Sequence, residues 1–213
     1  MKNVPFYPNH EGGMRCMLAV YASVLDYFLG QKPTWGELET LSGFDVSGNR
    51  AVWTVEPLPK MAKLGLDIRM IEPFNYPRFL DKGESYLSTL YSDEEIQWYY
   101  EHSTIRDMRN YIPEFLQTIA YECRQATLAD LDNMLAEDRL VFLSVNSKVL
   151  NDGPGFSSHA ILILSKEGGE YIAHDPGLPP QPYRRIESSK LWKAMGADDN
   201  TAEMTGFKKA ANG

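Results

Sequence analysis

The pattern of apolar and polar positions predicts helices over the first two thirds of the chain and strands over most of the last third. The clearest helix covers residues 14–29, where three polar residues interrupt an apolar run that Gly30 ends. A helix that is apolar on nearly every face is usually buried in the middle of a domain. We therefore expect this N-terminal helix to form part of the core.

Local end signals predict further helices in the middle of the chain. Three pairs of residues have the capping-box spacing, in which a Ser or Thr is followed three positions later by an acidic residue. These pairs are Ser92 with Glu95, Thr104 with Asp107, and Thr127 with Asp130. We expect a helical insertion or lid at about residues 84–125, with Cys123 in a helix as a structural or half-exposed residue. The aromatic and acidic residues in this part favour packing on the core, and a wall of a substrate cleft is the alternative.

The last third of the chain has the features of an antiparallel sheet. Short apolar runs over 140–145, 160–164 and 171–174 read as strands, and Gly168-Gly169 is typical of a hairpin turn. A short helix over 188–195 follows, and we expect a flexible tail after about residue 197. Helices followed by antiparallel strands indicate an α+β fold, which we expect to be a single domain over 1–213.

Cys16 is placed at the start of the buried helix. A thiol in the first turn of a helix lies at the positive end of the helix dipole, where unpaired backbone N–H groups stabilise a thiolate. Both effects lower the pKa of a thiol and make its sulfur nucleophilic. A lone cysteine in an apolar helix is more often a small core residue, so its partners decide between the two interpretations.

His159 and Asp175 are the candidate partners of Cys16. His159 follows a Gly/Ser-rich loop and opens an apolar strand, where an imidazole can accept a thiol proton and later protonate a leaving group. Asp175 ends the return strand, and the hairpin brings it close to the level of His159. A carboxylate there can hold the imidazole in the required tautomer. His174 points to the opposite face by strand alternation, and we interpret it as a surface or core-edge residue.

These residues, taken in order, resemble the papain-like cysteine peptidases, and most closely the group related to the double-glycine leader peptidases that process bacteriocin precursors. The resemblance covers most of the chain and is weakest in the central helical stretch. It rests on a cysteine opening a buried helix, a helix and strand over 55–71, a histidine opening an apolar strand, and Asp175-Pro176-Gly177 ending the next strand. It implies a papain-like fold, no cofactor, and amide hydrolysis through a thioester. Cys16, His159 and Asp175 match the nucleophile, the base and the orienting acid of this family.

Two positions depart from the family pattern. Met17 follows the cysteine, where the family usually has Gly, and a larger side chain can narrow the site. The family also places a Gln several residues before the cysteine, where its amide helps to bind the oxyanion. Here Asn9 and His10 occupy that region, and we expect them to supply the oxyanion hole, with His10 six residues before Cys16.

Composition narrows the possible partners. The 29 acidic residues exceed the 21 basic ones and leave a formal charge of −8, which argues against nucleic acid as a partner. The pair Arg184-Arg185 is explained by surface ion pairing. The chain has two cysteines, and no Cys, His or Asp set has a recognised ligand spacing, so neither a disulfide scaffold nor a metal site is expected. No segment has the length of a signal peptide core or a membrane span, so we expect a cytoplasmic protein with no membrane partner.

Two functions compete at this point. The first is a thiol hydrolase, acting on a peptide or a small amide through Cys16, His159 and Asp175. The second is a catalytically inactive papain-like scaffold that serves as a binding module, which the altered oxyanion region favours. The sequence identifies neither the substrate nor the oligomeric state.

Overall fold

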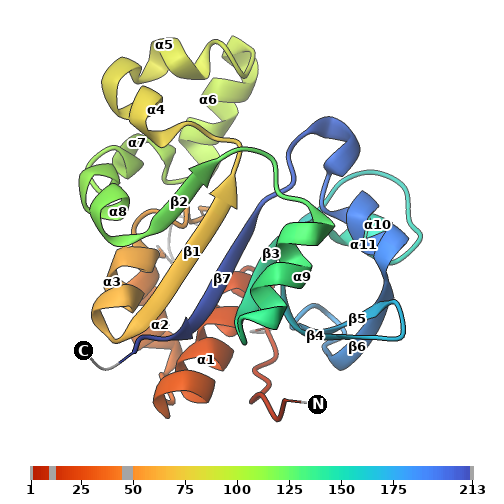
Figure 1. Ribbon diagram of the computed structural model, residues 1–213. Coiled ribbons are helices and arrows are strands. Elements are labelled where there is room, and N and C mark those ends of the chain that lie inside the picture. The colour runs from red at the N-terminus through yellow and green to blue at the C-terminus, as the bar shows by residue number, and fades with distance from the viewer. Residues whose placement is uncertain (1, 10–12, 45–49, 212–213) are drawn as a thin grey trace.

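A mixed seven-stranded sheet forms the centre of the protein in the computed structural model, which describes residues 2–9, 13–44 and 50–211 (Figure 1). The strands of these residues are β1 (Leu66–Glu72), β2 (Ala120–Cys123), β3 (Leu140–Asn146), β4 (Ser158–Glu167), β5 (Glu170–Asp175), β6 (Gln181–Glu187) and β7 (Met204–Lys209). Their order across the sheet is β2-β1-β7-β3-β4-β5-β6. All neighbours are antiparallel except β1 and β2, which are parallel. The sheet is therefore mixed rather than wholly antiparallel as expected, because the long helical connection from β1 to β2 provides the crossover that parallel strands need.

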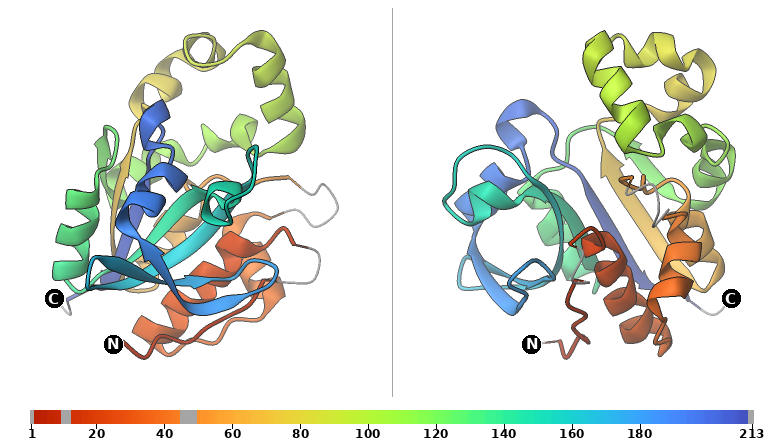
Figure 2. Two further views of the ribbon diagram at one scale, coloured as in Figure 1. Left: turned by 90° about the vertical axis from the view of Figure 1, so that its right-hand side faces the viewer. Right: turned by 180° about the vertical axis from the view of Figure 1, so that it is seen from behind.

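Helices cover both faces of this sheet (Figures 1 and 2). On one face lie α1 (Cys16–Leu29), α2 (Trp35–Ser42) and α3 (Pro57–Lys63). On the other lie α9 (Leu128–Ala136), α10 (Ser147–Leu150) and α11 (Ser188–Ala194), followed by the 3₁₀ turn η1 (Ala197–Asp199). Side chains of β4 alternate between two cores: Leu162 and Leu164 pack with α1, whereas Ile161 and Ile163 pack with α9 and α11. A strand with both faces covered is expected to be apolar throughout, which explains the continuous run at residues 160–164.

The buried N-terminal helix and the α+β class are confirmed. Within α1, residues 18–25 are all buried, and the helix packs on β4 and β7. Gly30 ends it in the left-handed conformation with φ of 67°, the geometry that lets a backbone N–H return to the last carbonyls. No described helix is long and apolar enough to span a bilayer.

A group of short helices connects β1 to β2; the first of them lie beyond the C-terminal end of β1, and the last lies beside β2 (Figure 1). They are α4 (Tyr76–Lys82), α5 (Glu84–Leu87), α6 (Asp93–His102), α7 (Ile105–Met108) and α8 (Ile112–Thr118). The capping boxes at Ser92 and Thr127 are present, but the hydroxyl of Thr104 makes no capping hydrogen bond. The helices end at Thr118, so the prediction that Cys123 lies in a helix is wrong. It belongs to β2, which pairs with β1.

The flexible tail predicted after about residue 197 is also wrong in its main part. Residues 204–209 form β7, which lies between β1 and β3 and is hydrogen-bonded to both. Met204 and Phe207 are fully buried. Gly206 leaves room for two side chains from the α9–β3 region, since a Cβ there would lie 2.7 Å from Met134 Sδ and 2.9 Å from Arg139 Cδ.

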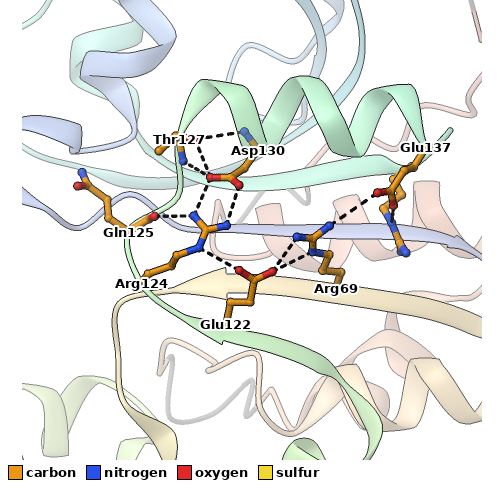
Figure 3. Close-up of polar contacts among 8 residues, drawn as sticks. Arg69, Glu122, Arg124, Gln125, Thr127, Asp130 and Glu137 are labelled. Carbon is orange, nitrogen blue, oxygen red and sulfur yellow. Dashed lines mark hydrogen bonds and ion pairs between the residues drawn. The ribbon is translucent and has the colours of Figure 1, made fainter.

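A chain of alternating charges holds the short edge strand β2 in place (Figure 3). The Glu122 carboxylate forms an ion pair with Arg69 Nη2 of β1 at 2.7 Å. It forms a second one at 2.9 Å with Nε of Arg124, which directly follows β2. Arg124 Nη2 also pairs with Asp130 of α9 at 2.7 Å. Single exposed ion pairs contribute little, but a network of shared partners fixes one geometry at a lower entropic cost per bond. These contacts join β1, β2 and α9.

Candidate active site

The loop before α1 places Cys16 in the first turn of that helix. The Asn9 side chain organises this loop, since its Oδ1 accepts the N–H of Arg15 and its Nδ2 donates to the carbonyl of Gly13, each at 3.0 Å. The backbone N–H of Asn9 donates to the carbonyl of Pro176 at 2.9 Å. These bonds bring the loop before Cys16 beside the loop that follows Asp175. The role of Asn9 as an oxyanion donor stays a prediction, and His10 lies outside the described residues.

His159 and Asp175 are directly bonded. Nε2 of His159 lies 2.6 Å from Oδ1 of Asp175, and the two side chains are only 11% and 5% exposed. His159 also interacts with the thiol of Cys16, and this interaction lowers the pKa of the thiol and raises the pKa of the imidazole. Because Nε2 is bonded to the carboxylate, Nδ1 is the ring nitrogen left for the sulfur. The structure thus brings Cys16, His159 and Asp175 together, and these three residues are called the triad below.

A bulge in β4 is what puts Asp175 on the same face as His159. Ser165 pairs with Ile172, but Leu162 pairs with His174, so β4 holds one extra residue between these two pairs. With regular pairing outward from the hairpin turn, Asp175 would lie opposite Leu162, whose side chain points to the α1 face. The extra residue moves it opposite Ile161, whose side chain shares a face with His159. A one-residue change of register moves every later side chain to the other face, which makes the bulge necessary for the triad.

The surroundings of Cys16 favour the charged form of the thiol–imidazole pair. Burial by itself raises the pKa of a thiol, but the pKa of Cys16 lies below its ordinary value. The hydrogen bond and charge of His159 and the N–H groups of Met17 and Ala160 all stabilise the thiolate. Burial likewise lowers the pKa of His159, but its bonds to Asp175 and Cys16 outweigh burial and raise that pKa to about 9. Burial opposes ionisation of Asp175 too, and its bond to His159 nevertheless holds the pKa of this carboxyl below its usual range.

Gly177 closes over the bond between His159 and Asp175. Its N–H donates to Asp175 Oδ1 at 2.9 Å. A Cβ at this position would lie 2.9 Å from Asp175 Oδ1 and 3.2 Å from His159 Nε2. The sequence Asp175-Pro176-Gly177 was interpreted only as the end of a strand. The glycine itself was the signal that was missed, because a residue with a side chain does not fit at this position.

Arg184 is a second residue at the site that the sequence interpretation missed. Its Nη1 donates to the remaining carboxylate oxygen of Asp175, Oδ2, at 2.7 Å. The interpretation of the Arg184-Arg185 pair as surface ion pairing is therefore wrong for Arg184. It holds for Arg185, which is half exposed and pairs with Glu167 and Glu170. Alternation along a strand separates the two arginines, but no sequence signal shows which of them points inward.

The two remaining candidates lie outside the triad. His174 is buried and belongs to the core: its Nε2 donates to the carbonyl of Val4 at 2.9 Å, and its Nδ1 accepts the N–H of Tyr183. Burial lowers the pKa of His174, so the ring is neutral. Cys123 is exposed in β2. Among the residues that the structure describes, no three His, Cys, Asp or Glu side chains are grouped to hold a metal ion.

The arrangement has the parts of a nucleophilic site. A nucleophile bonded to a base, which a third group holds, is the general signature of covalent catalysis by a thiol or hydroxyl. No protein-family model matches the chain, and no curated protein matches its sequence. The assignment of a function therefore rests on the geometry of the triad and its neighbours.

Proposed function

We propose that the protein is a papain-like thiol hydrolase that cleaves the amide bond of a peptide or a small amide through a thioester on Cys16. One observation carries the proposal: the thiol of Cys16 interacts with an imidazole whose Nε2 lies 2.6 Å from a buried carboxylate, and its pKa is lowered by that imidazole. A cysteine with no catalytic role requires neither partner. The lowered pKa of this thiol agrees with a nucleophile rather than with a core residue.

The proposed reaction has two halves. In the first, the thiolate of Cys16 attacks the amide carbon, the C=O oxygen becomes an oxyanion, and the imidazolium of His159 donates its proton to the leaving nitrogen. The C–N bond breaks, an amine departs and a thioester remains. In the second, neutral His159 takes a proton from water, the hydroxide attacks the thioester, and the carboxylic acid leaves as the S–C bond breaks. Asp175 holds the imidazole throughout and stabilises its charged form.

Three exposed apolar residues near the triad along the chain suggest which substrates to test. Met14, Phe156 and Leu178 are 43%, 76% and 63% exposed, and each lies within three residues of a triad member along the chain. Large exposed apolar side chains close to reacting groups are suited to contacts with a substrate. The negative charge of the protein disfavours acidic substrates. We expect fluorogenic amides with apolar acyl residues to be cleaved faster than matched amides with an acidic residue.

A binding module on the same scaffold is the competing proposal, and the contacts of Asn9 favour it. Its Oδ1 and one of the two N–H groups of its amide are used within the loop before α1, and losing one oxyanion donor costs about 10²–10³ in rate. Such a protein would retain the triad but turn over slowly or not at all.

Alkylation by iodoacetamide, measured at each cysteine by mass spectrometry across pH, tests the activated thiol that the hydrolase proposal requires, and turnover of the fluorogenic amides then separates an active enzyme from a binding module that keeps the triad. Cys123 serves as an exposed internal control. We expect Cys16 to react faster than Cys123 at pH 6, and His159→Ala to abolish that advantage because the thiolate loses its counter-charge. His102→Ala, on the exposed surface of α6, should change nothing. Equal labelling of the two cysteines, unaffected by His159→Ala, would favour the binding module.

A further inference from the structure

The guanidinium of Arg184 links three parts of the site. Besides the bond from Nη1 to Asp175 Oδ2, its Nη2 donates to the carbonyl of Leu150 at 2.6 Å and to Asn151 Oδ1 at 3.0 Å. Leu150 ends α10, which lies in the connection that leads to His159. The arginine therefore joins the end of β5 to the segment that precedes the base. With its side chain 13% exposed, it is largely removed from water.

A second bulge brings Arg184 to this position. Ala173 pairs with Arg184, but Asp175 pairs with Gln181, so β6 contains one extra residue between the two pairs. With regular pairing from Gln181, residue 183 would lie opposite Ala173, and Arg184 would point to the other face of the sheet. The extra residue puts Arg184 on the face shared by Ala173 and Asp175.

The bulge has a conformational cost. Tyr183, within it, has φ of 55°, in the left-handed region that bulky residues seldom adopt. Such strained positions persist where the surroundings determine them, and they concentrate at functional sites. The strain at Tyr183 is thus associated with the placement of a buried cation beside Asp175.

We infer that Arg184 is a positioning residue of the active site, which occupies Oδ2 of Asp175 so that the carboxylate stays ionised and presents Oδ1 to His159. The inference rests on the proposed function. Asp175 is 5% exposed, and a carboxylate removed from water needs a partner for each oxygen to remain charged. His159 and Gly177 are hydrogen-bonded to Oδ1, and Arg184 is hydrogen-bonded to Oδ2. A two-pronged guanidinium suits this position better than an ammonium, because it can hold the acid and the α10 end at once.

The test measures the bond between His159 and Asp175 itself. Proton NMR of protein with ¹⁵N-labelled histidine detects the hydrogen-bonded imidazole N–H, which His159→Ala identifies by its disappearance. We expect a protected, downfield resonance in the wild type and in Arg185→Gln, the matched control from the same strand. In Arg184→Gln it should broaden or vanish at neutral pH, because the carboxylate can rotate, and in Arg184→Lys it should be partly retained. Cys16 alkylation at pH 6 should fall at least severalfold in Arg184→Gln and less in Arg184→Lys.

The outcomes separate this inference from the proposed function. An Arg184→Gln protein that is folded by circular dichroism and keeps the wild-type resonance would overturn the positioning role. An equal loss in Arg185→Gln would also overturn it, since any lost charge would then suffice. If the resonance follows the expected order while wild-type Cys16 is no more reactive than Cys123, the role of Arg184 stands and the hydrolase proposal fails.

Discussion

Gly177→Ala tests whether the triad needs its observed geometry. The glycine has no left-handed φ, so the backbone accepts alanine, and the effect is confined to what the new methyl meets. At 2.9 Å from Asp175 Oδ1, the Cβ must separate from the oxygen by about 0.5 Å more to reach ordinary contact near 3.4 Å. His159 Nε2, at 3.2 Å, blocks the other side. Either the carboxylate or the imidazole must move, and both belong to the 2.6 Å bond that orients the base.

The magnitude follows from the cost of overpacking, about 1–3 kcal/mol for an extra methyl group in a filled site. An increase of about 1.4 kcal/mol in the activation free energy slows a reaction tenfold. If the whole cost raises the activation free energy, alkylation of Cys16 and amide hydrolysis should slow roughly 5- to 150-fold. The assay is Cys16 labelling at pH 6, with the melting temperature as a check of the fold. Gly153→Ala is the control, since its methyl would meet nothing closer than 3.7 Å. A folded Gly177→Ala protein that labels like the wild type would refute the claim that this geometry activates the thiol.

Two further predictions concern pH. The value of kcat/KM for an amide substrate should fall as pH rises through about 9, where His159 loses the proton that the leaving nitrogen needs, while labelling of Cys16 should not fall because the thiolate persists. Glu203→Gln should raise the melting temperature at pH 8 and leave it nearly unchanged at pH 4, with exposed Glu94→Gln as the control. Burial raises the pKa of Glu203. Burial and the charge of Glu203 raise the pKa of Glu72. The stability that the two protonated carboxyls contribute is therefore present below about pH 4.5 and is lost as pH rises through the raised pKa values. Each kcal/mol gained corresponds to about 2–4 °C in a protein of this size, and equal melting curves of Glu203→Gln and wild type at pH 8 would contradict the assignment.

Features with local causes could be predicted from the sequence. The capping boxes at Ser92 and Thr127 and the stop at Gly30 depend on hydrogen bonds within a few residues, and the structure contains all three. The Gly168-Gly169 turn is equally local, and both glycines have positive φ, as a two-residue hairpin turn requires. Thr104 shows the limit: its spacing is correct, but its φ and ψ of −90° and 20° are not those of an N-cap, and its hydroxyl makes no capping bond.

Strand β7 could not be predicted because its partners are distant. Its residues pair with residues of β1 that precede them by at least 133 positions, and with residues of β3 that precede them by at least 61. Residues 204–209 also include two lysines and a glycine, which lower their apparent strand character. The same limitation applies to β2, which is only four residues long and was assigned to the preceding helices. In both cases the neighbouring strands supply the hydrogen bonds that local preference does not.

The candidate site depends both on local features, which the sequence reveals, and on strand pairing between distant residues, which it does not. Cys16 and His159 were found because each opens an element with a clear boundary, a helix after glycines and a strand after a polar loop. Their meeting with Asp175 and Arg184 depends on two extra residues, one in β4 and one in β6, that no periodicity in the sequence reveals. Removal of either bulge would leave the strands paired but would move the acid or the arginine to the opposite face. The two bulges have compatible effects, since the first brings Asp175 to the face of His159 and the second brings Arg184 to the face of Asp175. The two register shifts therefore converge on one carboxylate, although neither is needed for the strands to pair.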